Sequence, residues 1–235
     1  GSAGRRRAHP GCCSPLMSGW VFLRHGQSQA NAEGWLSGHF DTGLTDLGRA
    51  QAVEAGLACR AWDFARVYSS DLVRARHTAE LAIEGRGLEL QVTSALRERS
   101  LGQWAKRPLA QIRAEGESHR LIDWHGSPPG GESMAQLAKR VMPFLAGLGE
   151  ADGPTLIVAH GGLIRVVLGL VDGLVLGDLD ELPPADAVPA DVGVVRVDEV
   201  VPVDPEQEEQ PGIACWFHDR CDQMEELGPI TAYLV

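Results

Sequence analysis

The sequence lacks a cysteine pattern that would predict a disulfide framework or a metal site. Only five cysteines occur in 235 residues, and no two of them form a C-x-x-C pair. Cys12 and Cys13 lie in the leading segment, and Cys59, Cys215 and Cys221 are an odd set without metal-ligand spacing. We therefore expect reduced thiols and no metal bound through cysteine.

Long hydrophobic runs are also missing. No stretch approaches the roughly 18 uninterrupted apolar residues that a membrane-spanning helix needs. The leading segment, GSAGRRRAHPGCCSPLMSG, has no apolar run after its arginines, as a secretory signal would. We expect a cytoplasmic protein with no membrane partner, in which residues 1–16 are a disordered leader or expression scar and residues 17–235 form a single domain.

The sequence also lacks an excess of positive charge. The formal net charge is −11, with 21 lysines and arginines against 32 aspartates and glutamates. A nucleic-acid-binding surface is normally basic, so no nucleic acid is expected as a partner. If the ligand is an anion, the positive charge that binds it must be concentrated in one place.

Short apolar runs alternate with segments of helical periodicity. Each run ends in polar residues or glycine, which is typical of buried strands that lead into loops. Such alternation predicts an α/β fold, a three-layer α/β/α sandwich with helices on both faces of a mainly parallel sheet. The strands are expected within residues 19–25, 64–71, 88–96 and 154–162, and the helices within 44–62, 72–85, 133–149 and 163–170.

For two of these helices, the sequence also indicates a capping residue at the N-terminus. Thr45 is expected to cap the first, and Glu132 is expected to cap the helix within 133–149, where its negative charge would lie near the helix N-terminus. The first helix is predicted from the near-helical spacing of Leu47, Val53, Leu57 and Ala61.

The C-terminal part, from about residue 172, is acidic and rich in loops. We expect a proline-rich loop over 179–193, a strand over 194–203, an acidic loop over 204–212 and an edge strand within 228–235. An edge strand there could support a homodimer.

Two histidines stand where apolar strands end. His25 in FLRHGQSQAN and His160 in VAHGG each follow a strand and precede a glycine. Ligand sites of parallel sheets lie outside the carboxyl ends of the strands. We therefore expect both histidines to face one crevice.

The residue types around these strand ends suit phosphoryl transfer. A neutral imidazole can attack phosphorus through one ring nitrogen when the other donates to a fixed acceptor. Arginines such as Arg24 and Arg74 can hold phosphoryl oxygens in bidentate geometry. A second histidine adds charge to the site, and a carboxylic acid must protonate the leaving alkoxide and later accept a proton from water.

Six segments in a fixed order resemble the histidine phosphatase superfamily, in its phosphoglycerate mutase-like branch. They are Arg24-His25-Gly26 with Asn31, then GLTDLGRAQA, SSDLVRARHTAE, LRERSLGQW, PPGGES and VAHGG. The match spans roughly Val21 to Leu170. The resemblance implies a phosphoglycerate mutase-like fold and a phosphatase that acts on a small phosphorylated metabolite without metal or cofactor.

The resemblance also implies a role for each matching residue. His25 would become phosphohistidine, and Glu98 would be the acid and base. Arg24, Arg74 and His160 would form the phosphate pocket. Asn31 would contact the substrate, and Gly161 would let the backbone approach the anion. Apart from the resemblance, the sequence leaves cations available to bind a second anionic group on the substrate, a carboxylate or a second phosphate: Arg97, Arg99, Lys106, Arg107 and Arg113.

Departures from the family pattern bear on the activity. Gln27 stands where glutamate is commoner, and Ala105-Lys106 replaces the Glu-Gly pair that usually follows G-x-W. Leu101 stands where the mutases have tyrosine, and only about sixty residues separate Glu98 from His160, too few for the segment with paired arginines that mutases insert. A phosphatase is therefore the main prediction, and a cofactor-dependent mutase and a non-catalytic binding module are the alternatives.

Each site assignment also has a structural alternative. His25 taken alone would be a hydrogen-bonded structural histidine, and Glu98 could belong to a solvated charge cluster. Arg74 could pair with Asp71 at i,i+3 on a helix surface. Asn31 could cap the segment that follows it.

Overall fold

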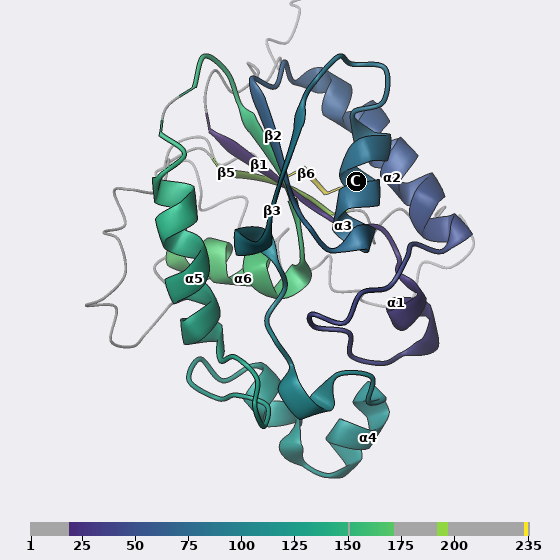
Figure 1. Cartoon of the computed structure of the whole chain (residues 1–235), viewed down its shortest axis with the longest axis vertical. Helices are drawn as coiled ribbons and strands as arrows, with labels where there is room; N and C mark the ends of the chain where they lie inside the picture. Colours follow the sequence, from purple (N-terminus) through teal and green to yellow (C-terminus); the bar gives the residue numbers. More distant parts are fainter. Residues whose placement is uncertain (1–18, 150, 172–191, 197–232, 235) are drawn as a thin grey trace, which may run out of the picture.

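A six-stranded parallel sheet organises the described part of the chain (Figure 1). The computed structural model describes residues 19–149, 151–171, 192–196 and 233–234. The strand order is β3-β2-β4-β1-β5-β6, and the hydrogen-bonded pairs are parallel. The strands are β1 (Trp20–Arg24), β2 (Arg66–Ser70), β3 (Leu90–Thr93), β4 (Thr155–Ala159), β5 (Val192–Arg196) and β6 (Tyr233–Leu234).

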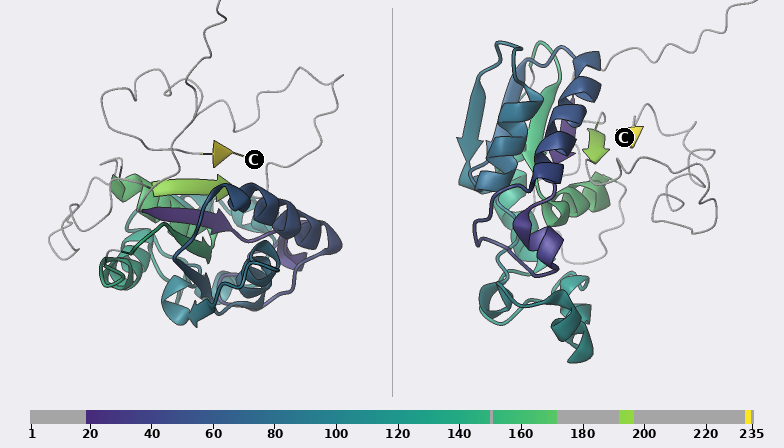
Figure 2. Two further views of the ribbon diagram at one scale, coloured as in Figure 1. Left: turned by 90° about the horizontal axis from the view of Figure 1, so that it is seen from above. Right: turned by 90° about the vertical axis from the view of Figure 1, so that its right-hand side faces the viewer.

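Helices cover both faces of this sheet. Helices α2 and α3 lie on one face and α5 and α6 on the other (Figures 1 and 2). The predicted α/β/α sandwich with a parallel sheet is thereby confirmed. The helices are α1 (Gln29–Glu33), α2 (Asp46–Ala58), α3 (Val73–Ala82), α4 (Leu109–Ala114), α5 (Met134–Ala146) and α6 (Gly161–Val171), with 3-10 turns η1 (Cys59–Ala61), η2 (Ser94–Leu96), η3 (Gly102–Trp104) and η4 (Glu117–Leu121).

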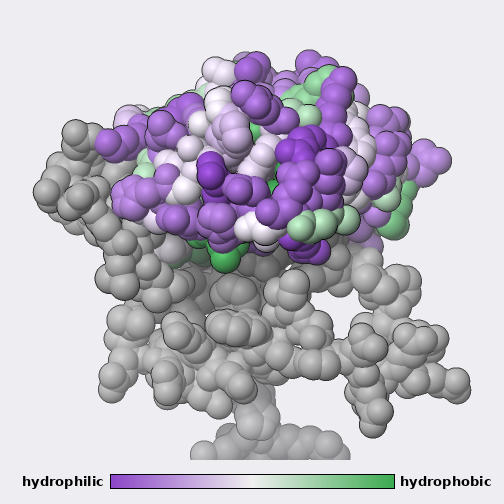
Figure 3. All heavy atoms as spheres, turned by 90° about the horizontal axis from the view of Figure 1, so that it is seen from below, coloured by the Kyte–Doolittle hydropathy of each residue, from purple (hydrophilic) through white to green (hydrophobic). Residues whose placement is uncertain are grey.

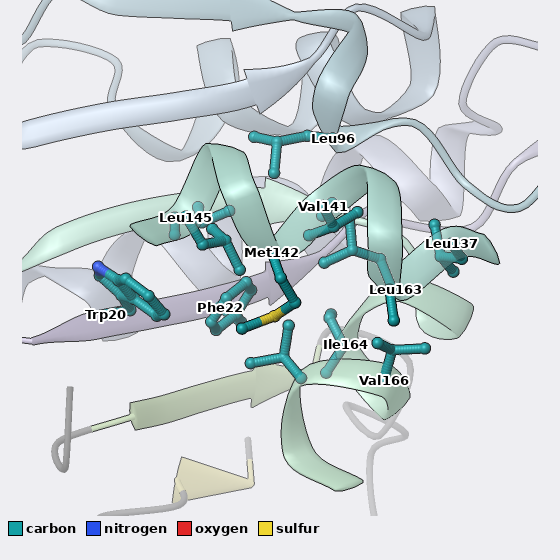
Figure 4. Packing of buried hydrophobic residues seen from close by; sticks show 14 residues of the cluster. Trp20, Phe22, Leu96, Leu137, Val141, Met142, Leu145, Leu163, Ile164 and Val166 are labelled. Atoms are coloured by element: carbon teal, nitrogen blue, oxygen red, sulfur yellow. The ribbon is translucent and has the colours of Figure 1, made fainter. Parts of the chain in front are cut away.

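Strand β1 shows why the sheet is buried on both faces. Its side chains alternate in direction, as in any strand. Trp20 and Phe22 pack with the residues of α5 and α6 (Figure 4), whereas Val21 and Leu23 pack on the side of α2 and α3. These four side chains are at most 3% exposed. The continuous apolar run before His25 is therefore the pattern of a central parallel strand.

The apolar residues that predicted α2 lie on its exposed side. Leu47, Val53 and Leu57 are 45–53% exposed. The buried side consists of small or polar residues: Gly48, Gln51, Ala52, Ala55 and Gly56. A Cβ on Gly56 would lie 2.7 Å from the carbonyl oxygen of Ala82 at the end of α3. Close helix packing on small residues, rather than burial of large ones, therefore holds α2 in place.

A small lobe between β3 and α5 extends beyond the body of the fold; we call residues 102–122 the cap. Its apolar centre is formed by Trp104 and Ile112 with the adjoining Leu101, and Leu36 and Leu121 pack against them. Figure 1 shows the cap at the bottom, around α4, and from that side the described surface is mainly hydrophilic (Figure 3). The cap is tied to the loop after α1, because the amide of Leu36 donates to the carbonyl of Arg107 (2.9 Å).

The C-terminal predictions are tested only in part. Strand β5 overlaps the strand expected over 194–203, and β6 lies at the sheet edge within 228–235. The leader, residues 1–16, and the acidic loop, 204–212, lie outside the described residues. Within the described ranges, no helix has the length and apolar character needed to span a membrane.

Buried and exposed leucines should contribute differently to the stability of the fold. Leu145→Ala, at a fully buried position of α5, should lower the free energy of unfolding by about 2–5 kcal/mol. Leu57→Ala, on the exposed side of α2, should change it by less than about 0.5 kcal/mol. Urea unfolding followed by circular dichroism measures both. Equal losses in the two variants would contradict the assignment of the buried face of α2.

Candidate active site

His25 lies directly after β1 and is held in one tautomer. Its Nδ1 is 2.8 Å from the carbonyl oxygen of Gly26, so Nδ1 carries the proton and donates it. Its Nε2 is 3.3 Å from Nε of Arg74, which donates to it. The ring is only 7% exposed. The lone pair available for attack is therefore on Nε2, as nucleophilic catalysis by a histidine requires.

Arg74, in the first turn of α3, is 1% exposed. Besides His25, its guanidinium donates to the carbonyl of Gly38 (2.8 Å) and to that of Phe40 (3.2 Å). No carboxylate of the described chain forms an ion pair with it. Asp71, its expected surface partner, instead binds Arg97 through both carboxylate oxygens (2.7 and 2.6 Å). The helix-surface alternative is therefore wrong. The charges of Glu98 and Asp41 act on the buried guanidinium without forming an ion pair, which leaves it suited to bind an anionic ligand.

His160 follows β4 and lies beside His25. Their ring centroids are 5.1 Å apart, and His160 is fully buried. Neither ring nitrogen of His160 has a hydrogen-bond partner within the described structure. Burial, followed by the charge of Arg74, lowers the pKa of both histidines well below the usual value. Both rings are therefore neutral, and His160 has a ring N–H to donate to a ligand.

Arg24, the last residue of β1, adds a second positive charge close to the two rings. Its charge also lowers the pKa of His25 and of His160. A Cβ on Gly161 would lie 3.4 Å from Nε of Arg24. Gly161 thus lies beside this guanidinium, while its predicted contact with a bound anion stays a prediction.

Glu98 is oriented by two backbone amides. Its Oε1 accepts from the amide of Arg99 (2.8 Å) and its Oε2 from the amide of Gly162 (3.0 Å). The carboxylate therefore lies at the N-terminus of α6, where negative charge is favoured. A Cβ on Gly162 would lie 2.3 Å from Oε1 of Glu98, so a side chain at this position would displace the carboxylate.

The loop that carries Glu98 is fixed from α5. Arg140 donates to the carbonyls of Ala95 (2.9 Å) and Glu98 (3.1 Å) and also pairs with the Glu132 carboxylate (3.0 Å). Glu132 in turn accepts from the amide of Ser100 (2.7 Å). The prediction that Glu132 caps α5 is wrong, because Ser133 is the N-cap residue. Arg140 and Glu132 together hold the loop on both sides of Glu98.

Two of the three predicted substrate contacts, Asn31 and Arg99, differ in position. Asn31 is exposed, and its Oδ1 accepts from the amide (3.1 Å) and the hydroxyl (2.8 Å) of Ser28, which closes a capping box on α1. Arg99 is 5% exposed; its Nη2 donates to the carbonyl of Leu121 (3.2 Å), and its Nη1 has no partner in the described structure. Asn31 thus has a structural role already, whereas Arg99 retains donors for a ligand.

Two residues at the site were missed by sequence analysis. Thr78 accepts from the amide of Gly26 (3.1 Å) and donates to the carbonyl of Arg74 (2.7 Å). Its position four residues after Arg74, on the same side of a helix, was the available signal. His39 approaches the carbonyl of Glu98 with Nε2 (2.6 Å); it had no comparable signal, because the contact spans 59 residues.

Comparison with known proteins agrees with this geometry. Residues 20–199 match the model of the histidine phosphatase superfamily (branch 1). The chain belongs to this superfamily. It is 40% identical, over 160 residues, to glucosyl-3-phosphoglycerate phosphatase of Mycobacterium tuberculosis (63% of this chain, 72% of the relative). It is 35% identical, over 161 residues, to adenosylcobalamin/alpha-ribazole phosphatase of Escherichia coli (66% of this chain, 79% of the relative).

A solved structure of the same superfamily has a similar fold. The mycobacterial glucosyl-3-phosphoglycerate phosphatase in complex with VO3 superposes with a TM-score of 0.61 at 39% identity. The match covers 66% of this chain and 81% of the other. The predicted family is therefore confirmed by sequence and by fold.

The two buried histidines predict how the stability of this histidine phosphatase depends on pH. Below about pH 6.5 the unfolded chain binds protons that the folded rings do not, because their folded pKa is lowered. Below pH 6.5, the free energy of unfolding should therefore decrease as the pH is lowered, by up to about 1.4 kcal/mol per pH unit for each histidine. Above that pH, the two histidines should not change how the free energy of unfolding depends on pH.

Urea unfolding in phosphate-free buffer between pH 8 and 5 tests this dependence. His160→Gln should reduce the slope below pH 6.5, whereas His119→Gln, at an exposed position, should leave it unchanged. Identical slopes for wild type and His160→Gln would show that His160 is not held neutral.

Proposed function

We propose that the chain is a phosphatase that hydrolyses a small-molecule phosphomonoester through a phosphohistidine at His25. The main support is the neutral imidazole whose Nδ1 is bound to Gly26 and whose Nε2 lies beside buried Arg74. That arrangement combines a nucleophile with fixed positive charge, the two components of phosphoryl transfer.

The first half-reaction transfers the phosphoryl group to the enzyme. Nε2 of His25 attacks phosphorus in line with the ester oxygen, and the bond between phosphorus and that oxygen breaks. Arg24 and Arg74 neutralise the phosphoryl oxygens, and His160 donates a ring N–H to them. Glu98, in its protonated form, gives its proton to the departing alkoxide, and the alcohol leaves.

The second half-reaction returns the phosphoryl group to water. Glu98, now a carboxylate, accepts a proton from the attacking water, and the bond between Nε2 and phosphorus breaks. Inorganic phosphate leaves, and His25 is again a neutral ring. The arginines and the second histidine supply the charge stabilisation that a metal ion would otherwise provide, so the reaction is proposed to need no metal or cofactor.

The substrate is proposed to be a small phosphorylated metabolite. Relatives act on glucosyl-3-phosphoglycerate and alpha-ribazole compounds, as their names state, and these differ widely in the leaving group. Arg99 is proposed to bind the leaving group through its unpartnered Nη1. Asn31 is proposed to contact the phosphate with its amide nitrogen. A cytoplasmic location and a homodimer stay predictions.

Replacement of the nucleophile tests covalent transfer. His25→Ala should abolish phosphate release, because it removes the imidazole whose Nε2 is proposed to accept the phosphoryl group. Release would be measured with a panel of phosphorylated sugars, nucleotides, phosphoglycerates and an aryl phosphate in the presence of a chelator. His119→Ala, at an exposed position, is the control. Turnover of His25→Ala within tenfold of wild type would contradict the mechanism.

The same panel separates the alternatives. A mutase would transfer phosphate between hydroxyls of one substrate without releasing it. A metal-dependent hydrolase would lose activity in chelator. A non-catalytic module would neither release phosphate nor form phosphohistidine.

The role of Glu98 predicts a dependence on the leaving group. Glu98→Gln should slow hydrolysis of alkyl phosphates by a factor of about 100 or more, because their alkoxides need a proton. Aryl phosphates with acidic phenols should be slowed much less. The measurement is kcat/KM for a series of esters of increasing leaving-group pKa. Equal slowing along the series would show that Glu98 has only a structural role.

A further inference from the structure

Lys106, in the cap, has a strained backbone conformation. Within the described residues it is the one non-glycine residue with positive φ, at 68°. An L-residue with a long side chain is disfavoured in this left-handed region, which glycine adopts freely. It replaces the glycine of the Glu-Gly pair that commonly follows G-x-W in the family. The chain therefore retains a lysine where a glycine would relieve strain.

Backbone hydrogen bonds fix the place of this strained residue. The amide of Lys106 donates to the carbonyl of Leu36 (2.7 Å), and the amide of Leu36 donates to the carbonyl of Arg107 (2.9 Å). These bonds join the cap to the loop between α1 and α2. The Nζ atom of Lys106 consequently lies over the ring of Phe40, 3.7 Å from its centroid.

Phe40 connects Lys106 to the phosphate-binding arginine. The carbonyl of Phe40 accepts from Nη1 of Arg74 (3.2 Å), so the residue that carries the ring also touches the catalytic guanidinium. The ring itself is 41% exposed, and Trp35 lies beside it at a centroid distance of 5.9 Å. Lys106 is thus linked to Arg74 through Phe40, whose ring lies under the ammonium and whose carbonyl binds the guanidinium.

Among the residues that the structure describes, no carboxylate neutralises the charge of Lys106. Its neighbour Arg107 pairs with Glu115, and Arg97 pairs with Asp71. Lys106 forms no ion pair with a carboxylate of the described chain. A cation over an exposed aromatic ring is only weakly stabilised, so this contact does not by itself explain why the strain is retained.

We propose that Lys106 is a specificity-determining residue that binds a second anionic group on the leaving alcohol of the substrate. This inference rests on the proposed function and narrows the substrate class to phosphomonoesters with a carboxylate or another negative charge besides the transferred phosphate. Phe40 holds the ammonium in place, and the strained bend sets its distance from Arg74.

A matched pair of ligands tests the proposal. Glycerol 3-phosphate and 3-phosphoglycerate differ in having a hydroxymethyl or a carboxylate group, and both contain one phosphate. Their Kd values would be measured by calorimetry in His25→Ala protein, so that binding does not depend on turnover. With Lys106 present, 3-phosphoglycerate should bind about tenfold more tightly than glycerol 3-phosphate, as expected for one charge-assisted hydrogen bond.

Three further changes in that background separate specificity from general effects. Lys106→Gly should bring the ratio of the two Kd values close to one, and Lys106→Arg should preserve it. Arg113→Ala, which removes an exposed charge of the same cap, should also preserve it. A ratio near one with Lys106 present, or a ratio that Lys106→Gly leaves unchanged, would overturn the proposal.

Thermal unfolding distinguishes a binding role from a structural one. Lys106→Gly should match or exceed the parent protein in Tm, by up to about 4 °C, because glycine relieves the left-handed strain. A clear fall in Tm would indicate that the lysine is retained for the fold and would contradict the proposal. Absence of phosphate release from wild type would instead contradict the proposed function, and the Kd ratio would still report on Lys106.

Discussion

The chemistry of the site depends on one hydrogen bond, from Nδ1 of His25 to the carbonyl of Gly26 (2.8 Å). It places the nucleophilic lone pair on Nε2, and it requires the backbone at Gly26 to be fixed. The amide of Gly26 is bound by Thr78, and a Cβ on Gly26 would lie 2.2 Å from the carbonyl oxygen of Gly48 in α2. The tautomer of the catalytic ring is therefore set by tight packing of the loop after β1 against α2 and α3.

The second constraint is positive charge buried in an acidic protein. The chain has a formal net charge of −11, yet Arg74 is 1% exposed and forms no ion pair with a carboxylate in the described structure. The same charge and the same burial keep His25 and His160 neutral, because they lower the pKa of each ring. One arrangement thus attracts the phosphate and leaves the nucleophile unprotonated.

The sequence predicted most of the sheet and the centre of the site, because both depend on local patterns. Apolar runs that end in histidine and glycine located β1 and β4, and family motifs located Arg74 and Glu98. The buried face of α2 was not predictable from large apolar residues, since glycine and alanine form its contact with α3. Contacts between distant segments could not be predicted from the sequence either. These contacts set the role of Glu132 and the left-handed backbone of Lys106.

The most direct test of the account is the identity of the atom that carries the phosphoryl group. A phosphoenzyme formed from an aryl phosphate, quenched at alkaline pH and examined by phosphorus–proton correlation NMR and peptide mapping, reports both the residue and the ring nitrogen. Phosphorus is expected on Nε2 of His25, because Nδ1 is bound to the carbonyl of Gly26. Phosphorus on Nδ1, or on any other residue, would contradict it.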